Sequence, residues 1–378
     1  MQTIQVGMGW FPEQAGGLNR YYLDLIRHLP EAGVGVTGLV AGSERVAAGS
    51  GGTVRAFAPI RCDIATRLQA VRAETRRALA QSPASLFVSH FALYAAPCLD
   101  LLGKQPFVVH FHGPWADEGR AEGASRVIAQ IKHWLEHQVY RRAQRFIVLS
   151  RAFGRVLEQR HGVAHDRIRV IAGGVDTARF DPPLSLSQAR EQLGWPTNRP
   201  IALVVRRLVR RMGLEDLIAA VKLARWEVPE LLVLIAGAGP LAAELEARVQ
   251  AEGLTQHVQL IGFLPDAQLP LAYRAADISI VPSVALEGFG LIVGESLAAG
   301  TPVLVTAVGG LPETIEALSP QCIVAERGAQ ALAASMVGAF LGRYELPSAA
   351  ECARHAYERF DWSVVAGRVR AVYDEVIQ

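Results

Sequence analysis

Short apolar runs bounded by glycine and proline alternate with longer helical patterns, and this alternation constrains the fold more than any other feature of the sequence. Such runs are typical of parallel strands buried on both faces, each joined to the next by a helix. The chain therefore predicts an α/β protein built from βαβ units. The predicted strands lie at residues 3–10, 34–41, 85–90, 106–113, 145–150, 168–175, 201–207, 230–239, 258–264, 278–283 and 301–307.

Helical patterns fill the intervals between these runs. Residues 17–33 predict a helix that ends at Gly33, and residues 126–143 predict an amphipathic helix. Residues 47–54, AAGSGGTV, predict a loop because glycine and small residues dominate them. In the second half of the chain, helical patterns occupy residues 213–224, 240–253 and 290–300.

The alternation is interrupted at residues 180–200, where proline and polar residues predominate. Such a stretch is typical of a domain boundary. We therefore expect two doubly wound, Rossmann-like domains, residues 1–180 and 181–360, that face an interdomain cleft. Ligands of doubly wound sheets bind at the carboxyl ends of the strands, so the loops after the strands hold the candidate site residues. The residues alone leave open where the last helical stretch, 361–378, packs.

Composition excludes several classes of protein. Apolar residues make up 51% of the 378 residues, which excludes a disordered chain, and the net charge of +2 gives no field to attract nucleic acid. The four cysteines are far apart in sequence, which favours reduced thiols. We expect no secretory leader, and no run approaches the roughly 18 apolar residues of a membrane helix. We expect a cytoplasmic protein.

The stretch EGFGLIVGE places Glu287 and Glu295 on either side of a glycine-rich turn. Gly288 and Gly290 permit a tight turn with positive φ and a close approach of a ligand to the backbone. The N–H groups of Gly290 and Leu291, at the start of a predicted helix, would form an anion site. One carboxylate would then bind sugar hydroxyls and the other ribose hydroxyls, with the phosphates between them. On spacing alone, two solvated surface glutamates are an equal alternative.

Four arginines, Arg206, Arg207, Arg210 and Arg211, lie at or just after the end of the predicted strand 201–207. A guanidinium group suits bidentate contacts with phosphate. For any single arginine of the four, a solvated basic face is an equal alternative.

Two loops of the first domain carry weaker signals. Gly16 and Gly17 precede a predicted helix, where small residues allow a phosphate or sugar to touch the backbone. His110 and His112 are two residues apart, so on a strand they face the same way. His112 lies at the strand end, where it can donate a hydrogen bond to a sugar hydroxyl. We expect His110 to be structural.

No metal site is predicted, since no Asp-x-Asp pair is present to hold a divalent cation on a diphosphate. His133 and His137 are four residues apart, but HWLEH lacks the H-E-x-x-H order, so we expect a solvated helix face there. GMGWFP departs from a dinucleotide-binding fingerprint because Pro12 occupies the position of the third glycine. That departure disfavours a nicotinamide oxidoreductase.

Taken together, six motifs resemble those of the retaining, metal-independent glycosyltransferases of family 4, which have the GT-B fold. The resemblance spans nearly the whole chain. It implies a hexosyltransferase of class EC 2.4, with an acceptor-binding first domain, a nucleotide-sugar-binding second domain and a last helix, 361–378, that crosses back to the first. The motifs are AGGLNR, FHGPW, RRLVRRMGLEDLI, IAGAG, GFLP and EGFGLIVGESLAAGTPVLVT.

The resemblance also implies roles for single residues. Glu287 would contact the donor sugar, Glu295 the ribose, and Arg207 the leaving diphosphate. His112 would contact the sugar near the reacting carbon, so that His112, Glu287 and Arg207 form the catalytic set. The other donor-binding positions that the resemblance implies are Gly16, Gly17, Arg211, Phe263, Leu264, Phe289, Gly290 and Leu291.

Two positions depart from the family pattern. Met212 stands where the family usually has lysine, five positions after Arg207, and Arg211 is the neighbouring cation. Gly173 stands where the family usually has asparagine. Loss of one phosphate contact would cost about 1.5–3 kcal/mol, as charge-assisted hydrogen bonds do.

We therefore expect an enzyme of polysaccharide biosynthesis that moves a sugar from a nucleoside-diphosphate sugar, a UDP-sugar such as UDP-glucose, to a hydroxyl of a glycan or lipid-linked saccharide. No cofactor and no metal are expected. A nucleotide-sugar epimerase of the same fold and a non-catalytic sugar-nucleotide binder are the alternatives. Residues 130–145 are basic and include Trp134, so peripheral contact with the inner face of a membrane is also left open, although core packing is favoured.

Overall fold

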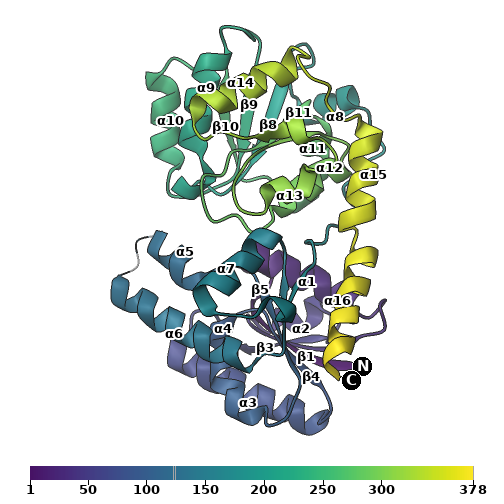
Figure 1. The fold of residues 1–378 in the computed structure, drawn as a ribbon. Helices are drawn as coiled ribbons and strands as arrows, with labels where there is room; N and C mark the ends of the chain where they lie inside the picture. The colour runs from purple at the N-terminus through teal and green to yellow at the C-terminus, as the bar shows by residue number, and fades with distance from the viewer. Residues whose placement is uncertain (122, 124, 378) are drawn as a thin grey trace. The chain divides into compact units, whose positions relative to one another are not determined.

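The computed structural model describes residues 1–121, 123 and 125–377. It divides into two compact units (Figure 1). Residues Met1–Gly174 and helix α16 (Trp362–Ile377) belong to the N-terminal unit, and Val175–Asp361 form the C-terminal unit. Among the described residues, no helix combines the length and the apolar character needed to cross a bilayer.

The N-terminal unit contains a seven-stranded sheet in which every neighbouring pair is parallel, in the order β3-β2-β1-β4-β5-β6-β7. The order steps from β1 out to β3, then returns to place β4 on the other side of β1. This is the doubly wound pattern that the sequence predicts. The strands are β1 (Gln2–Gly9), β2 (Gly35–Ala41), β3 (Val54–Ala58), β4 (Leu86–Ser89), β5 (Phe107–Phe111), β6 (Arg145–Val148) and β7 (Ile168–Val170).

The C-terminal unit repeats this plan with a six-stranded parallel sheet in the order β10-β9-β8-β11-β12-β13. The central strands are apolar along their length, and all five residues of β9 are buried. Such strands are stable only with helices on both faces. The strands are β8 (Ile201–Val205), β9 (Leu232–Ala236), β10 (Val258–Gly262), β11 (Ile278–Val281), β12 (Val303–Thr306) and β13 (Ile323–Val324).

Helices connect the strands in both units, and several begin with a side-chain cap. Ser185 and Ser348 open α8 and α15 through capping boxes with Gln188 and Glu351. In the N-terminal unit the helices are α1 (Gly17–His28), α2 (Arg45–Gly49), α3 (Ile64–Gln81), α4 (Ala92–Ala95), α5 (Trp115–Ala121), α6 (Arg126–Arg142) and α7 (Arg151–His161). In the C-terminal unit they are α8 (Leu186–Leu193), α9 (Leu214–Ala224), α10 (Ala242–Ala251), α11 (Leu269–Arg274), α12 (Leu291–Ala298), α13 (Leu311–Ile315), α14 (Ala329–Phe340) and α15 (Ala349–Phe360).

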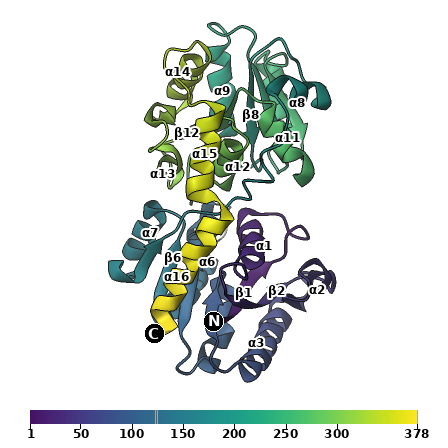
Figure 2. The same ribbon diagram turned by 90° about the vertical axis from the view of Figure 1, so that its right-hand side faces the viewer.

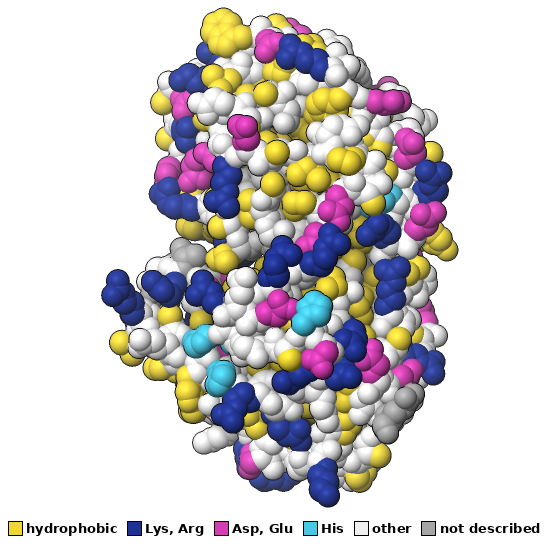
Figure 3. Space-filling view, in the orientation of Figure 1, with side chains coloured by type: hydrophobic (Ala, Val, Ile, Leu, Met, Phe, Trp, Pro, Cys, Tyr) yellow, Lys and Arg dark blue, Asp and Glu magenta, His cyan; other side chains and the backbone are white. Residues whose placement is uncertain are grey.

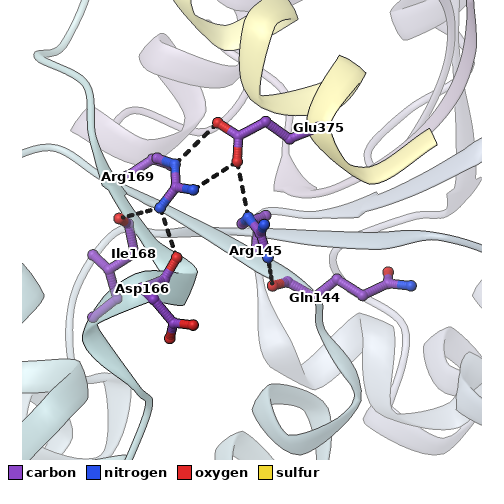
Figure 4. Close-up of polar contacts among 6 residues, drawn as sticks. All are labelled: Gln144, Arg145, Asp166, Ile168, Arg169 and Glu375. Carbon is purple, nitrogen blue, oxygen red and sulfur yellow. Dashed lines mark hydrogen bonds and ion pairs between the residues drawn. The ribbon is translucent and has the colours of Figure 1, made fainter. Parts of the chain in front are cut away.

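Helix α16 packs on α1, β5 and β6 of the N-terminal unit (Figure 2). Its Trp362 is buried and stacks on His28, with ring centroids 5.8 Å apart. Near its end, Glu375 accepts two hydrogen bonds from Arg169, at 3.0 and 2.7 Å, and one from Arg145 at 2.9 Å (Figure 4). Apolar and ionic contacts therefore hold this helix on a sheet whose strands lie far away in sequence.

Each sheet has one point at which the winding direction reverses, between β1 and β4 and between β8 and β11. At such a point the loops after the two adjacent strands run in opposite directions. This leaves room for a ligand at the carboxyl ends of the strands. In the C-terminal unit these loops begin at Arg206 and Pro282. In the N-terminal unit they begin at Trp10 and His90.

The structure corrects two local predictions and shows which residues of the glycine-rich turn have positive φ. Helix α1 ends at His28 instead of Gly33, because Pro30 has no N–H group to continue the helical hydrogen bonds. The predicted loop at 47–54 instead contains the end of α2 and the first residue of β3. Gly290 has a φ of 80°, but Gly288 is not among the described residues with positive φ, and Leu286 has a φ of 53°.

Candidate functional site

A buried ion pair lies at the winding reversal of the C-terminal unit. The Arg206 guanidinium, just after β8, donates hydrogen bonds to Glu287 Oε2 and Ser283 Oγ. The Ser283 hydroxyl donates to the same carboxylate oxygen at 3.0 Å. The Arg206 and Glu287 side chains are only 7% and 12% exposed. This ion pair thus connects the loop after β8 to the loop after β11.

Tight backbone contacts fix both partners of this pair. A Cβ on Gly237, in the loop after β9, would overlap the carbonyl oxygen of Arg206. A Cβ on Gly309 would overlap the carbonyl oxygen of Glu287, which also accepts a hydrogen bond from Gly310 N at 3.0 Å. Only glycine fits at these two positions. The loops after β8 and β11 are therefore held in place by close backbone contacts with Gly237 and Gly309.

The Glu287 carboxylate is ionised in this setting. Burial alone would raise its pKa, but the charge of Arg206 and the hydrogen bonds from Arg206 and Ser283 outweigh burial and hold the pKa below its usual value. Arg211 adds a smaller effect in the same direction. The Arg206 Nε atom is buried and has no hydrogen-bond partner. A fixed carboxylate therefore lies beside a buried guanidinium whose Nε has no partner.

Glu295, the second glutamate of the motif, lies within α12 and is nearly buried. Tyr273 donates a hydrogen bond from its hydroxyl to Glu295 Oε2 at 3.1 Å. This contact fixes the orientation of the carboxylate. The equal alternative of two solvated glutamates is therefore wrong, since neither Glu287 nor Glu295 is exposed.

The other arginines after β8 have separate environments. Arg207 is exposed. Arg210 forms ion pairs with Glu215 and Glu244 at 3.0 and 3.1 Å. Arg211 donates to the carbonyl oxygen of Leu286 at 3.0 Å. The sequence singled out Arg207, but the structure shows that its neighbour Arg206 contacts Glu287.

Met212 and the remaining predicted positions differ widely in burial. Met212 is buried beside these arginines and supplies no charge. Phe263 is 69% exposed, and Leu264 next to it is partly buried. Phe289 is buried against Phe360 at a centroid distance of 5.3 Å, so only its backbone is available to a ligand. Gly290 is the N-cap of α12, and Leu291 is its first residue.

The N-terminal unit places His112 next to a chain of buried hydrogen bonds. Gln5 Nε2 donates to Thr3 Oγ1 at 3.1 Å, which orients the Gln5 amide. Its Oε1 lies 2.9 Å from His90 Nε2, and His90 Nδ1 lies 3.3 Å from His112 Nε2. If Gln5 Oε1 accepts from His90, then His90 Nδ1 accepts from His112 Nε2. His112 is then left with a lone pair on Nδ1.

Burial lowers the pKa of His112 to about 3, so its imidazole is neutral near pH 7. In that tautomer His112 differs from the expected hydrogen-bond donor, because its Nε2 proton is already used within the protein. His110 is buried, and its two ring nitrogens lie 3.2 Å from Tyr21 and 2.8 Å from Tyr373. Those contacts agree with the structural role predicted for His110.

Gly16 and Gly17 form the start of α1. Gly16 is its N-cap with a φ of 151°, and a Cβ added at either glycine would meet no atom within 4 Å. The loop is therefore open enough to admit a ligand. Several residues that complete the two sites, among them Gln5, His90, Tyr273 and Ser283, carry no local sequence signal, because their partners come from distant segments.

Two family models match the chain. The model described as Glycosyltransferase Family 4 matches residues 15–179, and the model described as Glycosyl transferases group 1 matches residues 187–359. Together the two ranges cover more than half of the chain and include all the residues described in this section except Thr3, Gln5, Phe360 and Tyr373.

Curated relatives carry glycosyltransferase names. The 2-deoxystreptamine glucosyltransferase of Streptomyces kanamyceticus is 30% identical over 254 residues, which cover 64% of this chain and 65% of that protein. The D-inositol 3-phosphate glycosyltransferase of Streptomyces scabiei is 32% identical over 272 residues, which cover 68% of this chain and 58% of that protein. The chain thus matches less than two thirds of the length of either relative.

Solved structures share the fold over the whole chain. HepE from Anabaena, in complex with UDP, has a TM-score of 0.79 and 20% identity, and the match covers 99% of this chain and 100% of that one. Sucrose-phosphate synthase from Thermosynechococcus elongatus has a TM-score of 0.78 and 23% identity, with 99% and 98% covered. The two parallel sheets are thus those of the GT-B fold that the sequence predicts.

Proposed function

The chain belongs to the glycosyltransferases of family 4, and from this we propose that it transfers a hexosyl group from a nucleoside-diphosphate sugar to an acceptor hydroxyl with retention of configuration. The observation that carries the proposal is the ionised Glu287 carboxylate, held by Arg206 and Ser283 at the winding reversal of the C-terminal unit. A fixed carboxylate there suits sugar hydroxyls, since it accepts hydrogen bonds and cannot donate them.

The diphosphate would bind beside this carboxylate. Arg207 is exposed directly after β8, and the N–H groups of Gly290 and Leu291 open α12. Guanidinium groups and helix N-termini both stabilise phosphate charge. The position of Met212, where the family resemblance expects lysine, lacks a cation, and Arg206 and Arg211 supply charge near Glu287 instead. We assign the ribose hydroxyls to Glu295 and the base to the loop at Phe263 and Leu264.

In the proposed reaction, the bond between the anomeric carbon and the leaving phosphate oxygen breaks, and a bond to the acceptor oxygen forms on the same face. The acceptor proton passes to the leaving diphosphate. Negative charge grows on that diphosphate, and the arginines and helix N–H groups stabilise it. Because they supply the positive charge, we propose that transfer proceeds without added Mg²⁺ or Mn²⁺. The neutral His112, from the proposed acceptor-binding unit, would contact the sugar near the reacting carbon.

A thermal-shift screen of UDP-, GDP- and ADP-sugars tests donor binding, followed by release of the nucleoside diphosphate with candidate acceptors. We expect a UDP-sugar to raise the melting temperature and Glu295→Ala to abolish the shift. Arg207→Ala should weaken donor binding, whereas Arg210→Ala should not, because Arg210 pairs with Glu215 and Glu244. A donor shift that survives Glu295→Ala would remove the ribose role of Glu295.

Product analysis separates the proposed transfer from the alternatives. An epimerase of this fold would convert the donor into an epimer without an acceptor, and a non-catalytic binder would show the thermal shift without turnover. Retention predicts that the product has the anomeric configuration of the donor, which NMR of the product determines. An inverted product would contradict the proposed mechanism.

We further propose a lipid-linked acceptor at a membrane surface, because α6 exposes an apolar stripe. Val127, Ile131 and Trp134 recur at spacings of four and three residues and are 63%, 54% and 59% exposed. Basic residues on the same helix suit anionic headgroups, and basic side chains gather over α5 and α6 in the face drawn in Figure 3.

Ile131→Ser with Trp134→Ser should abolish flotation with anionic vesicles. Flotation that is unchanged would exclude this contact.

A further inference from the structure

Three side chains of the N-terminal unit form a cluster that the proposed transfer does not use. His133 and Glu136 come from α6, and His161 is the last residue of α7. One potential ligand atom from each residue lies within 4.8 Å of those from the other two. Imidazole nitrogens and a carboxylate oxygen are metal-ligand atoms, and these converge from two helices.

Two atoms of this cluster are buried without a hydrogen-bond partner. Glu136 is 1% exposed; its Oε1 accepts from Trp115 N at 2.9 Å, and Tyr140 interacts with the carboxylate, but Oε2 makes no hydrogen bond of ordinary geometry. His161 is 8% exposed, and its Nδ1 has no partner. Buried polar atoms are satisfied in nearly all folded proteins, so each exception needs an explanation. A ligand that binds both atoms supplies one.

Packing holds the three side chains in place around this point. The His133 ring stacks on the His161 ring at a centroid distance of 4.8 Å, and the Tyr140 ring meets His161 edge-on at 4.9 Å. The hydrogen bond from Trp115 N fixes the Glu136 carboxylate at the start of α5. His133 is exposed, so solvent reaches its ring from the side away from His161.

We propose that His133, Glu136 and His161 bind a divalent transition-metal ion, with Zn²⁺ as the ion that best fits the donor set. Two imidazoles and one carboxylate, with a fourth position open, form a known set of zinc ligands. Metal–ligand bonds of about 2.0–2.2 Å place ligand atoms roughly 3.3 Å apart, so binding draws the three side chains together. The ion would join the end of α7 to the middle of α6.

The fourth position would face a groove on the protein surface. A hollow of about 690 Å³ is lined by His133 and His137 from α6, Asp117 from α5 and Arg160 from α7, among others. Water, or an oxygen atom of a molecule in the groove, would complete the coordination. The sequence led us to expect that His133 and His137 lie together on a solvated helix face. In the structure, the side chain of His133 lies close to those of Glu136 and of His161 from another helix.

Zinc titration of the full, tag-free chain tests the site. The protein is stripped with a chelator, transferred to metal-free buffer, and titrated with ZnCl₂ in competition with a chromogenic chelator. We expect one Zn²⁺ per chain, bound with a dissociation constant below about 1 µM, and a higher melting temperature with the ion than without it. Co²⁺ in place of Zn²⁺ should give the visible absorption of a four-coordinate ion.

Substitutions locate the ion. His133→Ala removes an exposed ligand and leaves the core intact, and Glu136→Gln keeps the shape and the acceptor for Trp115 N; each should weaken binding roughly tenfold or more. His137→Ala is the matched control, one turn along α6 in the same groove, and should bind as the unmodified chain does. Absence of one-to-one binding, undiminished affinity in His133→Ala, or an equal loss in His137→Ala would overturn the proposal. None of these readouts depends on sugar transfer.

Discussion

The guanidinium of Arg206 is buried beside one carboxylate, so neither charge is well solvated. Glu287→Gln keeps the side-chain shape but leaves Arg206 without a counter-charge. Breaking a buried pair in this way typically costs about 3–5 kcal/mol. We expect the variant to lose about 3 kcal/mol of unfolding free energy in urea denaturation, and most of its transfer activity.

A double variant separates these two effects. Arg206→Met with Glu287→Leu replaces both charges by apolar groups, which is often neutral for stability. Stability should therefore recover while transfer stays lost, because the sugar hydroxyls have lost their acceptor. Recovery of transfer in the double variant would show that Glu287 acts only through folding.

Three neighbouring histidines make stability depend on pH. Burial lowers the pKa of His90, His110 and His112 below the usual value near 6.5. The unfolded chain therefore binds more protons than the folded chain below about pH 6.5. The free energy of unfolding is therefore not reduced by these histidines above that pH. It falls as the pH is lowered, by up to about 1.4 kcal/mol per pH unit for each histidine.

Urea denaturation between pH 8 and pH 5 measures this dependence. His90→Gln should reduce the slope, since one titrating group is removed, and the exposed His165 serves as the control position, through His165→Gln. A stability curve that stays flat across this range would contradict the account of buried, neutral imidazoles.

Single residues show how far the sequence could predict the site. The spacing of Glu287 and Glu295 was visible along the chain, because both flank one turn. The choice between Arg206 and Arg207 was not, because it depends on which side chain points toward Glu287, 81 positions from Arg206 along the sequence. Ser283 and Tyr273 had no motif at all, since a serine or a tyrosine near a carboxylate is recognisable only once the fold brings them together.

Among the loops that position the site, the one after β9 is tightly packed against the loop after β8. Gly237 lies against the carbonyl oxygen of Arg206 and has a φ of 148°, so Gly237→Ala must displace backbone. We expect a loss of at least about 2 kcal/mol of unfolding free energy, measured by urea denaturation, because both strain and overlap are introduced.

Gly367 in α16 is the matched control. It is exposed within the helix, and a Cβ there would meet no atom within 4 Å. Gly367→Ala should therefore stabilise the protein by roughly 1 kcal/mol, as alanine does in helix interiors. Equal effects of the two substitutions would mean that the crowding at Gly237 does not restrict the loop.

Elements were predictable where the apolar pattern was continuous. The strands β8, β9 and β12 are recognisable in the sequence because they are buried between other strands and helices. Such strands need apolar residues along nearly their whole length. Strand β3 escaped prediction because it lies at the sheet edge, where exposed Arg55 interrupts the pattern. The end of α1 was misplaced because the apolar period continues past Pro30, although the hydrogen bonds do not.

At the scale of the whole molecule, Trp362 links α16 to the N-terminal unit. Its ring stacks on His28 and lies 5.4 Å from the Tyr21 ring, and it is fully buried. Trp362→Ala should destabilise the N-terminal unit by about 3–5 kcal/mol through the cavity that it leaves. Calorimetry should then show the transition of the N-terminal unit shifted to lower temperature and that of the C-terminal unit unchanged.

Trp226 provides the control for this prediction. It lies in the C-terminal unit and is 77% exposed, so Trp226→Ala should leave both transitions in place. A shift of both transitions by Trp362→Ala would show that the two units unfold together.

The placement of α16 also affects the order of events during translation. The ribosome makes residues 175–361 before it makes 362–377, so the nascent C-terminal unit has its complete sequence while the earlier-made unit still lacks a helix. Tyr373 has then not reached His110, and the surface destined for Trp362 is uncovered. The unit whose synthesis begins first is therefore the unit whose sequence is completed last.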